Sequence, residues 1–185
     1  KKFQTYAGNA NSPYQLSWSN TFTFKDFTLY FLINGRIGGK VISLTESYLD
    51  RYGASERSGE ARLYAEQNNL YMPDGRHAMY LNEGRNKIAV EDYYTFLGTS
   101  DASSYIYDAT NFRLRELSLG YTFRNLFGDY KNLSISFVCR NLFFIYRAAP
   151  VDPDVSLSTA NGLGGIDVFN YPSARTFGLN IKVNL

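Results

Sequence analysis

The sequence predicts an all-β, antiparallel fold, and it favours an arc of a transmembrane β-barrel. Apolar and polar residues alternate in five stretches, each long enough for a tilted bilayer crossing of about 9–11 residues. Tyrosine and phenylalanine number 16 and 14 among 185 residues, and both favour strands and the aromatic girdles of barrels. A net charge of +2 gives no reason to expect a nucleic-acid partner.

The first two expected strands form a hairpin. Apolar residues occupy the even positions of residues 14–24, except Asn20, and the odd positions of residues 27–38. The pair Lys25 and Asp26 makes the short turn between them. Each strand therefore has one apolar and one polar face.

The next two strands are expected at residues 112–123 and 133–146. In the first of them the apolar positions change parity between Leu114 and Leu117. A single-residue bulge near Arg115 would reconcile the two halves, and so would an exit from the apolar layer at that point. The far end of the second is aromatic on both faces, as expected at a barrel rim.

The last expected strand, residues 175–185, alternates strictly, and its apolar face meets either a protein core or lipid. Five strands cannot close a barrel, because the smallest barrels have about eight. An open edge in hydrocarbon leaves unpaired amides, so the sheet is either a soluble sandwich or one arc of a larger barrel. An odd strand count favours the arc, since the first strand then needs an upstream partner.

The connections differ in length. Residues 25–26 and 124–131 are short turns, whereas residues 40–111, which include helix-like text, and residues 147–172 are long. Both long connections fall on one side of the expected sheet and both short turns on the other. Outer-membrane barrels show this asymmetry.

Three segments resemble the last third of SusC/RagA-like TonB-dependent outer-membrane transporters of Bacteroidota. They are GRIGGKVISLTESYLDRYG, KIAVEDYYTFLGTSDASSYIYDATNFRLRELSLGYTF and NLFFIYRAAPVDPDVSLSTANGLGGIDVFNYPSARTFGLNIKVNL. The matched text covers about residues 13–53 and 87–185. No apolar run approaches the roughly 18 residues of a membrane helix.

The resemblance implies that residues 1–185 are the last five or so strands of a plugged barrel of about 22 strands, with long extracellular loops. It implies an outer-membrane importer of oligosaccharides or peptides rather than an enzyme. The expected partners are the rest of the barrel with its plug, a SusD-like surface lipoprotein, the TonB complex and outer-membrane lipids. The plug and the TonB-contacting segment are not among the matched text.

With this resemblance, the apolar side of the last strand is expected to face lipid. These residues are Phe177, Leu179, Ile181, Val183 and Leu185. The polar side is expected to face the lumen or plug. The cationic candidates for that side are Arg113, Arg115, Arg140 and Lys182. A closing leucine departs from the aromatic residue that commonly ends such chains.

Aromatic residues of the two long connections are candidates for contact with substrate or with the lipoprotein. They are Tyr93, Tyr94, Tyr105, Tyr107, Phe169 and Tyr171. Aromatic faces stack on sugar rings, and tyrosine also anchors protein interfaces. Packing of the loops against each other is the alternative, and we favour it for most of the six.

No catalytic constellation is evident, and no cofactor is expected. Asp152 and Asp154 are weak Ca²⁺ candidates, because Ca²⁺ takes several oxygen ligands, but their spacing around Pro153 is typical of turn chemistry. The single histidine, His77, lacks an evident catalytic partner. Cys139 serves as a small hydrophobe.

Two other classes of protein remain as alternatives. A soluble β-sandwich carbohydrate-binding module would bury its alternating faces and need no detergent. A hydrolase using Asp152 or Asp154 would need a nucleophile or base beside them, and the sequence offers none.

Overall fold

A computed structural model describes residues 6–81, 84, 86–124, 132–155, 157 and 164–184. The chain divides into two compact units. The helical unit contains Lys1–Ala7, Ile42–Tyr107 and Ser156–Asn170, and the sheet unit contains Gly8–Val41, Asp108–Val155 and Tyr171–Leu185. Each unit is described by itself below.

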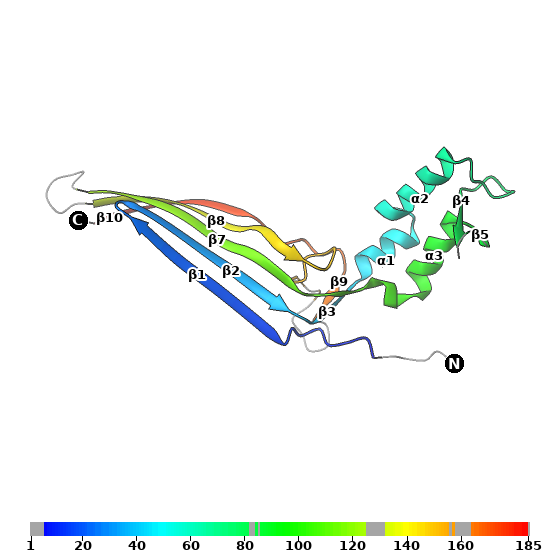
Figure 1. Ribbon diagram of the computed structural model, residues 1–185, viewed down its shortest axis with the longest axis horizontal. Coiled ribbons are helices and arrows are strands. Elements are labelled where there is room, and N and C mark those ends of the chain that lie inside the picture. The colour runs from blue at the N-terminus through cyan, green and yellow to red at the C-terminus, as the bar shows by residue number, and fades with distance from the viewer. Residues whose placement is uncertain are drawn as a thin grey trace. The chain divides into compact units, whose positions relative to one another are not determined.

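The sheet unit is built on five long strands that lie side by side in the order β1-β2-β7-β8-β10 (Figure 1). All neighbouring pairs are antiparallel. The strands are β1 (Tyr14–Phe24), β2 (Phe27–Ile37), β7 (Asn111–Phe123), β8 (Asn132–Arg147) and β10 (Thr176–Asn184). Each lies within a residue of the expected bounds, and Leu185 lies outside the described residues.

The strand register places like residues beside like across the whole sheet. One apolar row consists of Phe22, Leu29, Leu119, Phe137 and Leu179. The adjacent row, on the opposite face, consists of Thr23, Thr28, Gly120, Ser136 and Asn180. Directly opposed side chains on one face stabilise a sheet, so the alternation in each strand becomes one apolar and one polar surface.

A β-bulge at Arg115 keeps the apolar face continuous. Leu32 pairs with Glu116 but Ile33 pairs with Leu114, which leaves Arg115 as the extra residue of β7. This confirms the bulge expected from the parity change. On the other side β8 is also irregular, where Asn141 has a positive φ of 53°. The Arg115 Nη1 group donates a hydrogen bond of 2.9 Å to Asn141 Oδ1, which joins the two irregular positions.

The helical unit contains α1 (Leu44–Arg51), α2 (Glu56–Gln67) and α3 (Val90–Ser100). Ser43 and Ser55 cap the first two helices by accepting from the amides of Glu46 and Ser58. These two helices match the helix-like text, whereas α3 was not expected. The hairpin of β4 (Ala78–Leu81) and β5 (Asn86–Ala89) precedes α3. Among the described residues, no helix has the length and apolar character needed to cross a membrane.

A small sheet with the order β6-β3-β9 contains the strands at which the chain changes units. Its strands are β3 (Lys40–Ser43), β6 (Ile106–Asp108), which follows the 3-10 turn Ala102–Tyr105, and β9 (Ile166–Asp167). Within the helical unit, β9 runs parallel to the end of β3, and Ser43 Oγ donates to Asp167 Oδ2 at 2.9 Å. This bond ties the start of α1 to the second long connection.

Close packing of α1 on α3 depends on Gly98. A Cβ atom there would lie 2.5 Å from the Ser47 carbonyl oxygen and 2.7 Å from the Arg51 amide nitrogen. Gly98→Ala is therefore expected to push the helices apart and to reduce the local stability of the helical unit by about 2 kcal/mol. Hydrogen exchange of the α1 and α3 amides measures this change.

Gly59 in α2 provides the matched control, because its added Cβ would meet only an arginine side chain at 4.0 Å. Gly59→Ala should leave the helical unit unchanged or stabilise it, by up to about 1 kcal/mol. Equal effects of the two substitutions would contradict the assigned packing.

Candidate functional site

The apolar face of the five-stranded sheet is largely uncovered. On β10, Phe177, Leu179, Ile181 and Val183 are 63%, 65%, 58% and 48% exposed. The same face continues as exposed side chains on the other strands, at Tyr14, Leu16, Trp18, Phe22, Phe24, Phe27, Leu29, Leu119, Phe123 and Phe137. An apolar patch of this extent is unusual on a soluble monomer and marks a surface that contacts protein or lipid.

Aromatic pairs stabilise this face. Trp18 meets Phe31 edge to face with ring centres 5.1 Å apart, and Phe27 meets Tyr121 in the same way at 4.7 Å. Cys139 lies on the same face, where it pairs in register with Phe177, but its side chain is only 6% exposed. It is a free thiol, in keeping with the expected role as a small hydrophobe.

The opposite face is polar and has small side chains. Thr122 and Ser134 share a hydrogen bond of 3.0 Å, and Arg140 Nε donates to Glu116 Oε2 at 3.1 Å. Lys182 is exposed on β10. Of the four cationic candidates, Arg140 therefore pairs with a residue of the neighbouring strand, and Lys182 is exposed on this face.

The other two cationic candidates, Arg113 and Arg115, belong to a charged cluster where the long connections leave the sheet. Arg113 is 3% exposed, and its Nη2 lies 2.7 Å from Asp152 Oδ2. The guanidinium of Arg113 also stacks on the ring of Phe144 at 3.9 Å from its centre. A buried arginine with this pairing fixes the segment after β8 against β7.

The same cluster holds both calcium candidates. Asp152 Oδ1 accepts from the Asp154 amide at 3.0 Å, which is the expected turn chemistry, and Asp152 Oδ2 accepts from the Ser173 amide at 3.0 Å. Burial opposes ionisation of Asp152, but Arg113 and these amides outweigh it and lower the pKa of Asp152. Both aspartates therefore face guanidinium groups, an environment that repels a cation.

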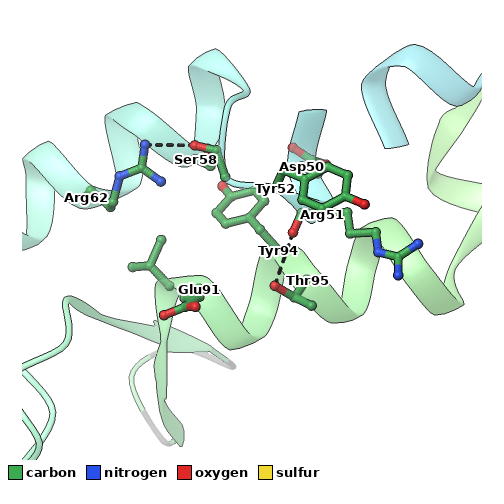
Figure 2. A pocket seen from close by; sticks show the side chains of 10 residues that line it. Asp50, Arg51, Tyr52, Ser58, Arg62, Glu91, Tyr94 and Thr95 are labelled. Atoms are coloured by element: carbon green, nitrogen blue, oxygen red, sulfur yellow. Dashed lines mark hydrogen bonds between the residues drawn. The ribbon is translucent and has the colours of Figure 1, made fainter. Parts of the chain in front are cut away.

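In the helical unit, a pocket of about 350 Å³ lies between α1, α2 and α3 (Figure 2). Arg62 Nη2 donates to the Gly53 carbonyl at 2.9 Å on one side of it, and Thr95 Oγ1 donates to the Arg51 carbonyl at 3.4 Å on another. Its other lining side chains are Asp50, Tyr52, Ser58, Val90, Glu91 and Tyr94.

Asp50, at the wall of this pocket, organises the helical unit. Its carboxylate is fully buried and accepts two hydrogen bonds from Arg57, one of them from Nε at 3.0 Å. Tyr105 OH donates to the same carboxylate at 2.7 Å. Burial opposes ionisation, but these bonds and one from Ser55 outweigh it, so the pKa of Asp50 is lowered. The pKa of Tyr105 is raised by burial and by its bond to Asp50.

The aromatic candidates separate into buried and exposed groups. Tyr105 and Tyr94 are 1% and 8% exposed and pack inside the helical unit, so the packing alternative holds for these two. Tyr93 and Tyr107 are half-buried. Phe169 is 59% exposed and stacks on Tyr48 with ring centres 6.0 Å apart, and Tyr171 is 92% exposed. Of the six candidates, Phe169 and Tyr171 are thus the exposed ones.

His77 and the acidic residues are the side chains on which catalytic or metal chemistry would depend. His77 lies beside Tyr71, with ring centres 5.4 Å apart, and no carboxylate bond to it is seen there. Within the described ranges no cluster of three or more histidine, cysteine, aspartate or glutamate residues has a metal-binding arrangement.

The chain is similar to a curated protein and to part of a solved structure. The chain is 24% identical over 185 residues to TonB-dependent receptor P3 of Formosa agariphila, a match that covers 95% of this chain and 17% of the receptor. Its fold is similar to part of the RagAB peptide importer in the 'open-open' state, with a TM-score of 0.59 and 14% identity. That match covers 95% of this chain and 17% of the importer chain.

No family model matches the chain. The two matches confirm the resemblance indicated by the sequence motifs, and the structural match shows that the fold of this chain occurs in a larger importer chain. The chain spans 17% of the length of each of these two proteins.

Substitution of the buried Asp50 tests its role in the stability of the helical unit. Asp50→Asn is expected to lower the local stability of the helical unit by about 2 kcal/mol, because Arg57 and Tyr105 lose a charged acceptor. Hydrogen exchange of the α1 and α2 amides measures it. Asp74→Asn is the control, since Asp74 pairs with Arg76 at the surface and should matter little.

The same network has a defined pH dependence. Since the folded-state pKa of Asp50 is lowered, its stabilisation is complete above the unfolded pKa of about 3.9 and is lost as the pH falls through the folded value. Exchange of the α1 amides should therefore accelerate, beyond the intrinsic chemical rate, below about pH 4 in the wild type. The Asp50→Asn variant should lack this acceleration, and an identical pH profile in both proteins would contradict the assignment.

Proposed function

We propose that this chain forms part of the wall and the extracellular loops of a TonB-dependent outer-membrane importer. The uncovered apolar face of the sheet carries this proposal. Its five strands are 11, 11, 13, 16 and 9 residues long, and about 9–11 residues cross a bilayer at a tilt. With lipid against the apolar face and water or a plug against the polar one, both surfaces of the sheet are satisfied.

The edges of the sheet support an arc of a larger barrel. Among the described residues β1 and β10 have one neighbour each, so each presents an unpaired row of backbone groups. Unpaired amides in hydrocarbon are costly, and a closed barrel removes them. In the proposal, further strands of the same barrel pair with β1 and β10.

The connections fit extracellular loops. In the sheet register, Asn111 at the start of β7 lies beside Arg36 near the end of β2 and beside Arg147 at the end of β8. The long connections 38–110 and 148–175 therefore leave the same end of the sheet, and the strand ends that the short connections join lie at the other. In outer-membrane barrels the long loops face outward and the short turns face the periplasm.

The relatives suggest how the assembled protein works. One is a TonB-dependent receptor and the other a peptide importer, and neither description names an enzyme. We propose that a SusD-like lipoprotein covers the extracellular side, that TonB supplies energy through a plug, and that the cargo is an oligosaccharide or a peptide. Of the six aromatic candidates, Phe169 and Tyr171 are the ones exposed for contact with the lipoprotein or the cargo.

A soluble β-sandwich remains the alternative, and the structure offers a reason to prefer the barrel arc. A sandwich covers the apolar face of one sheet with a second sheet about 10 Å away. The described residues contain only small sheets besides the long one, of three and two strands.

Spin labels along β10 test the proposed function. In a Cys139→Ala background, labels at Leu179→Cys and Ile181→Cys should collide with lipid-soluble oxygen and be shielded from a water-soluble nickel chelate. Labels at Asn180→Cys and Lys182→Cys should be at least about threefold less accessible to oxygen, because side chains alternate between faces. Paramagnetic relaxation of each label in native outer membranes measures both accessibilities.

The two classes of site act as controls for each other. Shielding of all four labels from oxygen, or access of the nickel chelate to Leu179→Cys and Ile181→Cys, would support a sandwich core or a soluble surface and rule out the lipid-facing assignment.

A further inference from the structure

We propose that Arg36, Arg113 and Arg115 form a binding site for a carboxylate group on the polar face of the sheet, and that Asp154 is its displaceable internal occupant. All four side chains belong to the sheet unit. The proposal rests on their contacts and does not depend on whether the sheet lies in a membrane.

Asp154 is surrounded by arginine side chains but held only by long contacts. Its Oδ1 lies 3.3 Å from Arg36 Nε, and its Oδ2 lies 3.7 Å from Arg113 Nη1 and 3.9 Å from Arg115 Nη1. Charge-assisted hydrogen bonds between guanidinium and carboxylate are about 2.7–2.9 Å long. Three arginines thus surround the carboxylate of Asp154, but none of these contacts is as short as such a hydrogen bond.

The carboxylate of Asp152, by contrast, is held by short contacts. Asp152 binds Arg113 Nη2 at 2.7 Å and also accepts from the amides of Ser173 and Asp154. Asp152 therefore holds the segment after β8 in place. Because that anchor is separate, the Asp154 side chain can turn away without releasing the segment.

Hydrogen bonding at the cluster is incomplete. Arg113 Nη1 and Asp154 Oδ1 are both buried and have no hydrogen-bond partner among the described residues. An unpaired buried donor is costly, and a second oxygen atom beside Arg113 Nη1 would satisfy it. Arg113 itself is 3% exposed, so its position is fixed before a ligand arrives.

The charge balance favours an anion. Three arginines stand against two aspartates, which leaves one positive charge uncompensated. A pocket of about 80 Å³ adjoins Arg36, Arg115 and Asp154. Its further polar lining is Gln15, Ser17, Asn34 and Asn111. The space can hold a single carboxylate group or water.

A carboxylate is the chemistry that this arrangement recognises best. Guanidinium groups bind carboxylates through paired, parallel hydrogen bonds, and Asp154 shows that a carboxylate is accepted at this place. Two sources supply such a group: a free organic acid, and a larger molecule that ends in a carboxylate, such as a peptide with a free C-terminus.

The test uses ¹³C-labelled acetate and the intact protein purified in detergent. Acetate should bind weakly to the wild type and about tenfold more tightly to Asp154→Asn, which removes the competing charge. It should bind the double variant Arg36→Gln/Asp154→Asn about tenfold more weakly than Asp154→Asn. Relaxation of the acetate carboxyl resonance measures the affinities.

Controls separate this site from general charge effects. Arg124→Gln, at the opposite end of the sheet where Arg124 pairs with Asp26 at 2.7 Å, should bind acetate like the wild type. Acetamide, which has the same shape without the charge, should not bind. Unchanged exchange of the Ser173 amide in Asp154→Asn shows that Asp152 still holds the segment.

Two further probes distinguish the source of the carboxylate. N-acetyl-dialanine with a free C-terminus, compared with its amide, reports whether a peptide end reaches the site, and acetate alone reports a site for small acids. Equal acetate affinity in the wild type and Asp154→Asn, or equal binding of acetate and acetamide, would overturn the proposal and leave a pocket filled by water.

Discussion

A sheet whose two faces differ this much is stable only where each face meets a matching medium. The register sets apolar residues beside one another across β1, β2, β7, β8 and β10, and it sets hydroxyl, glycine and amide residues beside one another on the reverse face. Exposing such an apolar face to water costs free energy in proportion to its area. The bulge at Arg115 matters for this reason, because without it Leu114 would turn to the polar side and Arg113 to the apolar side.

Buried ion pairs fix the segments in which apolar and polar residues do not alternate. In the helical unit, Asp50 joins α1 to α2 through Arg57 and to the end of the first long connection through Tyr105. In the sheet unit, Arg113 and Asp152 attach the start of the second long connection to β7. A buried charge without its partner is strongly destabilising, so each pair fixes the arrangement of its own unit. Long connections with such fixed contacts are suited to present a defined surface.

The strands could be predicted from the sequence because their signal is local. Alternation reports the face of each residue directly. The parity change between Leu114 and Leu117 indicated either a bulge or an exit from the apolar layer, and the strand register decides for the bulge. Helix α3 was missed because Tyr93, Tyr94, Thr95 and Phe96 favour strands, and because Gly98 weakens a helix. Its helical state depends on packing against α1, where Gly98 permits the close approach.

Contacts between distant residues explain the other differences. Tyr94 and Tyr105 were candidates for surface recognition, but the carboxylate of Asp50, 55 residues from Tyr105 in the chain, draws Tyr105 into the helical unit. Asp152 was weighed as a calcium ligand against a turn residue. Its turn bond to the Asp154 amide could be foreseen, whereas its pairing with Arg113 could not, because only the folded sheet brings them together. Sequence spacing alone carries no signal for either contact.

The single tryptophan reports directly whether lipid lies against the apolar face. Trp18 projects from that face of β1 and is 59% exposed. In vesicles of phospholipids brominated on their acyl chains, Trp18 fluorescence should be strongly quenched. A Trp18→Phe/Ser19→Trp variant, which moves the indole to the polar face, should be quenched much less. Equal quenching of the two proteins, or no quenching of Trp18, would contradict a membrane-facing sheet.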